Sequence, residues 1–234
     1  MEEKEAQQTS IVRQGALRKQ RLWVVRHGET FWNAEQRFCG SSDIDLSLKG
    51  QKQALWAAEQ LKDQSLTALY ASDLVRARRT AELIAQHQPE PLVVQTLPAW
   101  REISFGDWEG MTYDQITERY GEPRAFFTDR LNAVPPNGEA FADFAQRIQT
   151  VFRELLHSRK EQQGDLALVC HGGVVRVLVC LVLKIPFERQ WQFRVDNASL
   201  TAIDFYPDGV DPIASASLIV SNYHSGLLDK SDQS

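Results

Sequence analysis

The segments LWVVRHG, residues 22–28, and LVCHGG, residues 168–173, have the same form. Each is a short apolar run, typical of a buried strand, that ends at a histidine followed by glycine. A single loop histidine would not by itself indicate a functional site, because histidine is often partly buried. Binding sites in open α/β sheets form beyond the carboxyl ends of the strands. Two such ends therefore predict that His27 and His171 face one pocket, with glycine letting backbone N–H groups approach a ligand.

Predicted strands and helices alternate along the rest of the chain. We expect strands at 66–71, 91–94 and 166–170, one or two strands within 191–205, and an edge strand at 213–220. We expect helices after Ser47, after Ser72, at 112–120, at 141–156 and from Gly172 onward. This alternation predicts an α/β fold with three layers, in which helices cover both faces of a mostly parallel central sheet. The pattern weakens over about 100–139, which indicates an inserted cap region.

The chain shows no internal repeat and no linker between two cores, so we expect one domain. Residues 1–20 are polar and predict a mobile N-terminal extension, the domain occupies 21–224, and 225–234 predict a flexible tail. No segment has the length of a membrane span or the form of a signal peptide.

Composition narrows the class of partner. The 234 residues carry 31 acidic and 26 basic side chains, a net charge of −5. A general nucleic-acid-binding protein usually has a basic balance, so we expect no nucleic-acid partner and no membrane partner. Three cysteines, an odd number, argue against a disulfide framework and favour a cytoplasmic location. A homodimer formed through an edge strand or the N-terminal extension stays open.

Two arginines accompany the histidines. Arg26 directly precedes His27, and Arg76 comes early in a predicted helix that follows a strand, at the same side of the sheet. Guanidinium groups bind phosphate oxygens through paired hydrogen bonds. Two arginines at this place are therefore compatible with a local basic pocket for a small anion. Arg176, alone in a predicted buried helix, is expected to form a structural pair.

These residues lie in motifs that resemble the histidine phosphatase superfamily, with its phosphoglycerate-mutase-like fold. The motifs follow one another in the order of that family over about 21–205: RHGET at 26–30, RFCG at 37–40, SDLVRARRTA at 72–81, REISFGDWEG at 101–110 and CHGG at 170–173. Departures from the family pattern include Cys39, where many relatives carry Gln, and Ala140, where related phosphatases carry Ser.

The resemblance implies a metal-independent phosphomonoesterase that works through a phosphohistidine and needs no cofactor. It assigns His27 as nucleophile and Glu102 as the acid that protonates the leaving group and later activates water. The remaining implied residues bind the phosphoryl group: Arg26, Arg76 and His171 as catalytic residues, and Asn33, Cys39, Gly40 and Gly172 as substrate-binding residues. Asp107 and Glu109 are weaker candidates for the acid, and Trp108 is expected to serve packing.

Other interpretations compete with this one. Two histidines and a glutamate also suggest zinc, but two arginines in the same pocket would repel a cation, so we expect no metal. Mutase members of the family carry a different acid motif, which favours a phosphatase by analogy. A catalytically inactive binding relative would be expected to lack His27, Glu102 or His171, and all three are present.

The substrate is predicted only by analogy. Residues 135–141, PPNGEAF, resemble a segment of α-ribazole phosphatases, which suggests α-ribazole 5′-phosphate. Alternatives are a cofactor-dependent phosphoglycerate mutase and a phosphatase of phosphoserine, sugar phosphates or glycerate phosphates.

Overall fold

The computed structural model describes residues 18–121 and 133–227. Within them one six-stranded sheet has the order β3-β2-β4-β1-β5-β6. Its strands are β1 Gln20–Arg26, β2 Leu66–Ala71, β3 Val94–Thr96, β4 Asp165–Cys170, β5 Leu200–Phe205 and β6 Ser217–Tyr223. The β1–β4, β2–β4 and β2–β3 pairs are parallel, whereas β1–β5 and β5–β6 are antiparallel. The predicted mostly parallel sheet is confirmed.

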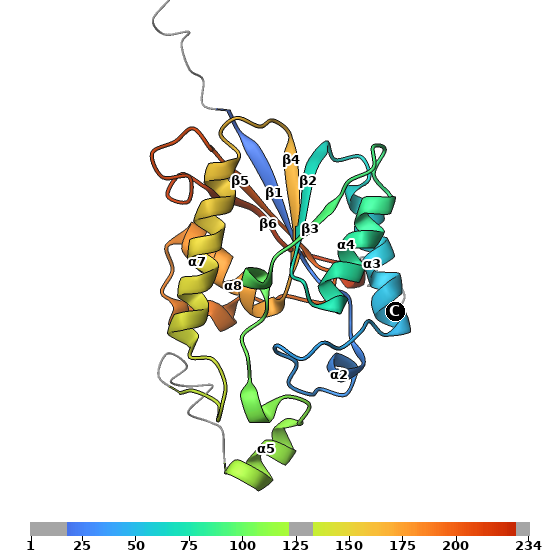
Figure 1. Ribbon diagram of the computed structural model, residues 1–234, viewed down its shortest axis with the longest axis vertical. Helices are drawn as coiled ribbons and strands as arrows, with labels where there is room; N and C mark the ends of the chain where they lie inside the picture. Colours follow the sequence, from blue (N-terminus) through green and yellow to red (C-terminus); the bar gives the residue numbers. More distant parts are fainter. Residues whose placement is uncertain (1–17, 122–132, 228–234) are drawn as a thin grey trace, which may run out of the picture.

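Helices cover both faces of this sheet, as the three-layer prediction requires (Figure 1). They are α2 Phe31–Ala34, α3 Leu48–Leu61, α4 Val75–Gln86, α5 Tyr113–Tyr120, α7 Phe141–Ser158 and α8 Gly172–Leu183, with short 3-10 helices η1 Pro98–Trp100, η2 Gly106–Trp108, η3 Phe187–Gln192 and η4 Ser225–Leu227. The pair α3 and α4 lies on one face, and the pair α7 and α8 on the other (Figure 1). Two separate apolar clusters fill the two interfaces.

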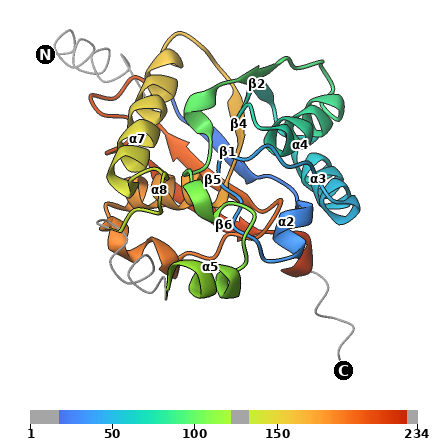
Figure 2. The same ribbon diagram turned by 60° about the horizontal axis from the view of Figure 1, so that its bottom comes forward.

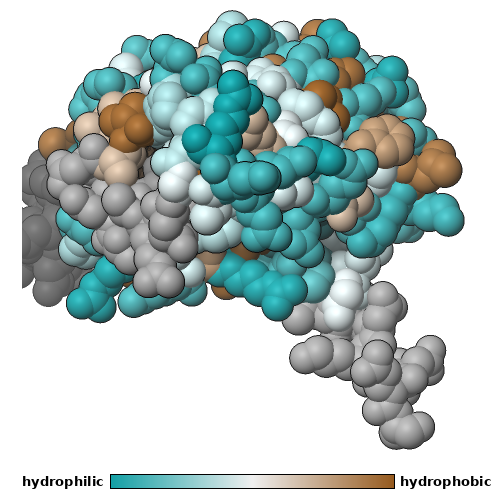
Figure 3. Space-filling model, turned by 90° about the horizontal axis from the view of Figure 1, so that it is seen from below, coloured by the Kyte–Doolittle hydropathy of each residue, from teal (hydrophilic) through white to brown (hydrophobic). Residues whose placement is uncertain are grey.

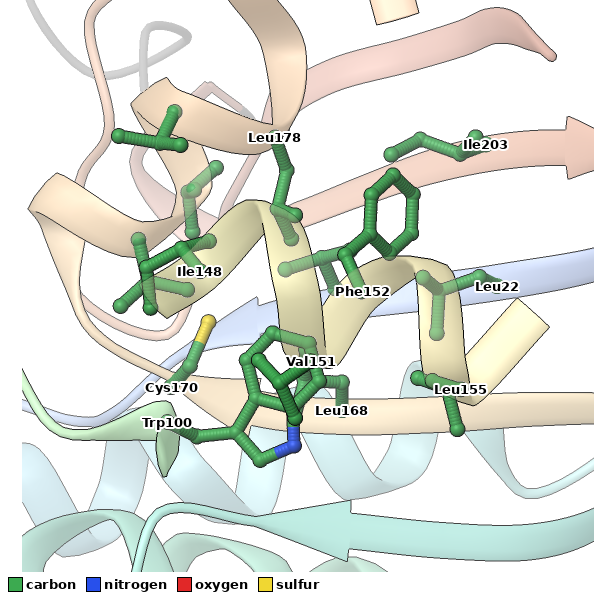
Figure 4. Close-up of a cluster of buried hydrophobic side chains, with 14 of the residues drawn as sticks. Leu22, Trp100, Ile148, Val151, Phe152, Leu155, Leu168, Cys170, Leu178 and Ile203 are labelled. Atoms are coloured by element: carbon green, nitrogen blue, oxygen red, sulfur yellow. The ribbon is translucent and has the colours of Figure 1, made fainter. Parts of the chain in front are cut away.

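The larger cluster forms because α7 repeats apolar residues at intervals of three and four, which gather on one face. Its side chains Ile148, Phe152 and Leu155 face Leu22 and Leu168 of the sheet (Figure 4). Helix α8 is apolar on nearly all sides and lies buried beside α7. The apolar face of α7 and the buried helix α8 thereby pack against β4, the strand that precedes His171.

Helix starts agree with the predictions where a side chain caps them. The Ser47 hydroxyl accepts from the Gly50 amide and caps α3, and Thr112 caps α5 in the same way. Ser72, which precedes the second of these predicted helices, does not cap it, because α4 begins at Val75 and Leu74 is its N-cap residue. The carboxylate of Asp43, from a distant loop, accepts from the Val75 amide at 2.6 Å instead.

Several strand boundaries differ from the expected ones. Gln20 belongs to β1 rather than to the extension, because its buried amide donates to the carbonyls of Arg159 and Gln162. Strand β3 starts at Val94, where the predicted strand ended. The predicted 191–205 strands reduce to β5, and the 213–220 edge strand lies at β6. The expected extension and tail otherwise lie largely outside the described residues, although Ser225–Leu227 forms η4.

The carboxyl ends of the parallel strands point toward α2 and α5 (Figures 1 and 2). The segment between η1 and α7, which includes α5, corresponds to the predicted cap, and its residues 122–132 lie outside the described part. No helix among the described residues is long and apolar enough to cross a membrane. This end of the sheet is where the sequence places both histidines.

Candidate active site

His27 and His171 lie side by side at the ends of adjacent parallel strands. His27 follows β1 and His171 follows β4, and the His27 amide donates to the Cys170 carbonyl at 2.9 Å. Their ring centroids are 5.1 Å apart with planes inclined by 62°. Both side chains are almost fully buried. The predicted convergence of the two histidines on one site is therefore present.

Hydrogen bonding sets the tautomer of His27. Its Nδ1 lies 2.7 Å from the Gly28 carbonyl oxygen. A carbonyl only accepts, so Nδ1 carries the proton and Nε2 keeps its lone pair. Burial lowers the pKa of His27 well below its ordinary value of 6.5, and the charges of Arg76 and Arg26 lower it further. The ring is a neutral imidazole with an available lone pair on Nε2.

His171 has the opposite tautomer. Its Nδ1 faces Nε of Arg76 at 3.3 Å, and a guanidinium only donates. The proton of the neutral ring is therefore on Nε2, a buried nitrogen with no hydrogen-bond partner among the described residues. Burial is the largest cause that lowers the pKa of His171, followed by Arg76 and His27. The second ring thus offers an N–H donor where the first offers a lone pair.

Arg76 is fully buried in the first turn of α4 without a carboxylate within ion-pair distance among the described residues. Its two terminal nitrogens donate to the carbonyls of Ser42, at 2.6 Å, and Gly40. A Cβ on residue 40 would lie 2.3 Å from the Ile103 carbonyl, so the chain needs glycine there. Backbone carbonyls orient the guanidinium and leave its charge uncompensated, which suits a site for an anion.

Arg26 points to the same region from the end of β1. Its Nη1 donates to the Val195 carbonyl at 2.7 Å, and its Nε is buried without a partner among the described residues. Burial and the nearby Arg176 lower the pKa of Arg26 to about 10, so it stays charged at neutral pH. A Cβ on residue 172 would lie 3.6 Å from this Nε. The guanidinium therefore adjoins the N-terminus of α8, where the helix dipole also favours anions.

Glu102 reaches the same helix end from the cap side. One carboxylate oxygen accepts from the Gly173 amide at 2.8 Å and the other from the Ile103 amide at 3.0 Å. A side chain on residue 173 would collide with this carboxylate, at 2.2 Å. In sequence, Gly173 lies two positions after His171. The predicted acid is therefore held beside the histidine pair.

Glu109, a weaker candidate for the acid in the sequence analysis, contacts a loop instead. Its carboxylate accepts from the amides of Ser41, at 2.7 Å, and Ser42, at 2.6 Å, and from both hydroxyls. Burial opposes its ionisation, but the hydrogen bonds from Ser42 and Ser41 outweigh it and lower the pKa of Glu109. This clamp fixes the loop whose carbonyls hold Arg76. Sequence analysis missed the role because the contact joins segments far apart in the chain.

Asn33 is oriented by two donors. Its Oδ1 accepts from the Thr30 amide and from Nδ2 of Asn197, both at 3.2 Å. The amide nitrogen of Asn33 is consequently left to face the other way. Asn197 also donates to the His27 carbonyl at 3.3 Å. Nothing in the sequence pattern singled out Asn197, which follows no recognised motif.

Cys39 lies in the loop next to Gly40, half-buried. Burial is the main cause that raises the pKa of its thiol. The side chain is thus a neutral thiol at this place. Asp107 is exposed and contacts Asn137, and Trp108 is buried in packing contacts with Phe38, as expected.

The end of the molecule that carries this site is seen in Figure 3, where hydrophilic residues dominate the described surface and hydrophobic ones form separate patches. Among the described residues, no group of three or more His, Cys, Asp or Glu side chains is arranged to hold a metal ion. The site combines two neutral imidazoles, two guanidiniums and one carboxyl group. Such a set can attack, hold and protonate the parts of a phosphate ester.

Comparison with known proteins agrees with this geometry. The sequence profile of the histidine phosphatase superfamily (branch 1) matches residues 22–214. The adenosylcobalamin/alpha-ribazole phosphatase of Escherichia coli (strain K12) is 34% identical over 185 residues, which are 79% of this chain and 89% of that protein. A probable phosphoglycerate mutase GpmB of Erwinia tasmaniensis is 35% identical over 184 residues, covering 78% and 84%.

A solved structure gives the same result in three dimensions. A putative alpha-ribazole-5′-P phosphatase from Escherichia coli K-12 superposes with a TM-score of 0.77 at 32% identity, covering 87% of this chain and 96% of that one. The shared architecture extends over most of both chains.

Proposed function

The chain belongs to the histidine phosphatase superfamily and is a phosphatase, and on that premise we propose that it hydrolyses phosphomonoesters through a phosphohistidine at His27, without a metal ion. The two tautomers carry this proposal. Nε2 of His27 has its lone pair available because Nδ1 is protonated against the Gly28 carbonyl. Nε2 of His171 carries a proton because Nδ1 accepts from Arg76. One ring is ready to attack phosphorus and the other to hold a phosphoryl oxygen.

In the first step, Nε2 of His27 attacks the phosphorus, and the bond from phosphorus to the ester oxygen breaks. Glu102 transfers its proton to that oxygen, so the leaving group departs as a neutral alcohol. Arg26, Arg76 and the Nε2–H of His171 hold the phosphoryl oxygens. Positioning and fixed positive charge supply most of the rate acceleration in phosphoryl transfer.

In the second step, water attacks the phosphohistidine. Glu102, now a carboxylate, accepts a proton from that water as the new bond to phosphorus forms. The bond from phosphorus to nitrogen breaks, its electron pair returns to Nε2 of His27, and inorganic phosphate leaves. The Gly173 and Ile103 amides hold the Glu102 carboxyl group in place for both steps.

The remaining predicted residues support phosphate binding. The orientation of Asn33 directs its amide nitrogen away from Thr30 and Asn197, which suits donation to a phosphoryl oxygen. The Gly172 amide, at the start of α8, is a further donor. Gly40 acts through Arg76, by its carbonyl. Cys39 adjoins this loop, where a thiol replaces the side chain that many relatives carry.

We propose α-ribazole 5′-phosphate as the substrate to test first. The Escherichia coli relative is named an adenosylcobalamin/alpha-ribazole phosphatase, and the fold neighbour carries a similar name. The relative named a probable phosphoglycerate mutase keeps the mutase as the second candidate. A mutase would return the phosphoryl group to a second hydroxyl instead of to water.

Initial rates of phosphate release, measured in buffer with a metal chelator, test this function. The panel holds α-ribazole 5′-phosphate, ribose 5-phosphate, phosphoserine, 3-phosphoglycerate and 4-nitrophenyl phosphate. We expect α-ribazole 5′-phosphate to have the highest kcat/KM, well above ribose 5-phosphate, which has the same kind of primary phosphate. Conversion of 3- to 2-phosphoglycerate without phosphate release would instead identify a mutase.

Trapping of the phosphoenzyme tests the nucleophile. Rapid acid-free quenching with a ³²P-labelled substrate should give alkali-stable, acid-labile label on the wild-type chain. His27→Ala should carry none. Label that persists at normal stoichiometry in His27→Ala would remove His27 from the mechanism.

A further inference from the structure

The tautomer of His27 depends on the direction of one peptide group, the one that joins Gly28 to Glu29. Its carbonyl accepts from Nδ1 of His27 at 2.7 Å. Its N–H belongs to Glu29 and donates to Oε1 of Gln53, in α3, at 2.9 Å. In a trans peptide the C=O and the N–H point in opposite directions, and the described residues contain no cis peptide bond. The oxygen of Gln53 therefore determines where the Gly28 carbonyl points.

The preceding peptide group, between His27 and Gly28, is held by other contacts. The Gly28 amide donates to Oγ1 of Thr80 at 3.2 Å, and the His27 carbonyl accepts from the Ala198 amide at 3.1 Å. These bonds do not fix the next peptide, because rotation about ψ of Gly28 separates the two groups, and glycine has the greatest backbone freedom. Within the described ranges, the Gly28–Glu29 peptide is thus held only by the His27 ring on one side and by Gln53 on the other.

Helix α3 lies close enough to supply this oxygen because residues 28 and 50 are both glycine. A Cβ on either one would collide with the backbone of the facing segment. The Ser47 amide also donates to the Glu29 carbonyl at 2.8 Å, which fixes the start of α3 against the same loop. Side chains on a helix lean toward its N-terminus, so Gln53, three residues after Gly50, reaches back to the Glu29 amide.

From this geometry we infer that Gln53 is a positioning residue for the nucleophile. Its side-chain oxygen accepts from the Glu29 amide, directs the Gly28 carbonyl to Nδ1 of His27, and so keeps the lone pair of that ring on Nε2. The inference rests on the proposed function, because a nucleophilic His27 is what needs this lone pair. Gln53 lies outside the motifs at 26–30, 37–40 and 72–81, and the sequence pattern gave it no role.

Removal of the acceptor has a defined consequence. The Glu29 amide would be left partly buried without a partner, which costs free energy that the peptide regains by turning its N–H toward water. The same turn moves the Gly28 carbonyl away from Nδ1. The ring of His27 then has no acceptor that selects the Nδ1–H tautomer, and part of the population carries its proton on Nε2, where it blocks attack on phosphorus.

Nitrogen-15 NMR of the ligand-free chain at neutral pH reads the tautomer without any reaction. Protonated and unprotonated ring nitrogens differ in chemical shift, and their couplings to the ring protons distinguish Nδ1 from Nε2. The chain has five histidines, so the signals of His27 are identified as those lost in His27→Ala. We expect a single Nδ1–H tautomer for His27 in the wild-type chain.

Three variants test the role of the Gln53 oxygen. Gln53→Met keeps the length of the side chain without that oxygen, so we expect both tautomers of His27 and phosphoenzyme formation slowed roughly 5- to 10-fold, the effect of one hydrogen bond. Gln53→Glu retains an acceptor and should keep the Nδ1–H tautomer, with a rate within about threefold of the wild type. Gln51→Met changes an exposed glutamine of the same helix and is the matched control, which should equal the wild type in both measurements.

Each outcome supports or overturns the inference. A single Nδ1–H tautomer in Gln53→Met would overturn it, even if the rate falls. Gln53→Glu that alters the tautomer as much as Gln53→Met would overturn it too, because the acceptor would then not be the cause. If circular dichroism shows that Gln53→Met is unfolded, Gln53→Asn, which withdraws the oxygen by one methylene, replaces it with the same expected change.

Failure of the proposed function would look different. Phosphoenzyme label that persists in His27→Ala would remove His27 as nucleophile, whereas the tautomer of His27 and its response to Gln53→Met would still be measured. A shifted tautomer together with an unchanged rate of phosphoenzyme formation would overturn the link between Gln53 and catalysis.

Discussion

Arg76 donates from Nε to Nδ1 of His171 across 3.3 Å, deep inside the protein, and this one contact sets the protonation state of the ring. A guanidinium cannot accept a hydrogen bond, so His171 must keep its lone pair toward Arg76. Burial, and after it the charge of the same guanidinium, lowers the pKa of both His171 and His27 and keeps the two rings neutral. The contact thereby prepares an N–H donor and a nucleophile in adjacent rings.

This arrangement predicts how stability depends on pH. The pKa of His171 is lowered in the folded chain, so the unfolded chain binds more protons as the pH falls through about 6.5, and stability falls with it. Between pH 7.5 and 5.5, one such histidine removes about 1 kcal/mol from the free energy of unfolding. We expect His171→Gln to lose about 1 kcal/mol less than the wild type over this range.

Urea unfolding at a series of pH values measures this difference. The window lies above the range in which carboxylates such as Glu109, whose pKa is lowered, take up protons. His87→Gln, on the exposed end of α4, is the matched control and should follow the wild-type slope more closely. Parallel curves for the wild type and His171→Gln would show that the buried ring is not held neutral.

The loss of kcat in Glu102→Gln should depend on the basicity of the leaving group. Glutamine keeps the shape of the side chain but has no proton to give to the departing oxygen. We expect kcat to fall by a factor of about 10² to 10⁴ for an alkyl phosphate and by much less for 4-nitrophenyl phosphate, whose leaving group needs little protonation. Steady-state rates on both substrates measure this. Asp107→Asn, an exposed carboxylate in the same segment, serves as control, and equal losses on both substrates would contradict the acid role.

Glu109→Gln should weaken phosphate binding for every substrate alike. An amide cannot accept from all four donors of Ser41 and Ser42, so the loop that orients Arg76 through its carbonyls loosens. We expect kcat/KM to fall roughly tenfold, independent of the leaving group, and the Kd of orthovanadate to rise by a similar factor. Titration calorimetry with vanadate measures the second effect. Glu59→Gln, an exposed residue of α3, is the control; unchanged vanadate affinity in Glu109→Gln would refute the clamp.

Replacing Asn197 by aspartate should slow phosphoenzyme formation more than replacing it by alanine does. Its amide donates to the His27 carbonyl and to Oδ1 of Asn33, both of which only accept. Alanine removes these bonds, whereas a carboxylate in Asn197→Asp would be repelled by both oxygens. We expect the rate of phosphoenzyme formation to fall about tenfold in Asn197→Ala and further in Asn197→Asp. Rapid-quench kinetics decides the order, and an aspartate variant as active as the wild type would exclude this positioning role.

The parts of the fold that could be predicted from sequence are those with strong local patterns. Helix α7 is an example, because Phe144, Ile148 and Phe152 recur with the helical period and their burial follows from that period alone. The strands that end at His27 and His171 were recognisable because an apolar run stops abruptly at His-Gly. The observed limits of β3 and of the antiparallel β5–β6 edge differ from the predicted ones, because these limits depend on which neighbouring strands pair with them.

The residues of the candidate site also divide into those that could be predicted from sequence and those that could not. His27, His171, Arg26, Arg76 and Glu102 stand in recognisable motifs, and the structure gathers them at one end of the sheet. Glu109 was considered for another role, and Asn197 was not considered at all. Their partners, Ser41 and Asn33, lie in other segments, and a hydrogen bond between distant segments leaves no periodic signal in the chain.

Residue type and short-range pattern are enough to predict which chemical groups the site contains and at which strand and helix ends they occur. The tertiary structure alone decided which nitrogen of each histidine carries the proton. That depends on a carbonyl at Gly28 and on a guanidinium brought from α4 against the end of β4. It also decided that an aromatic pocket adjoins Glu102, since Phe141 and Trp191 meet there only after α7 and η3 pack together.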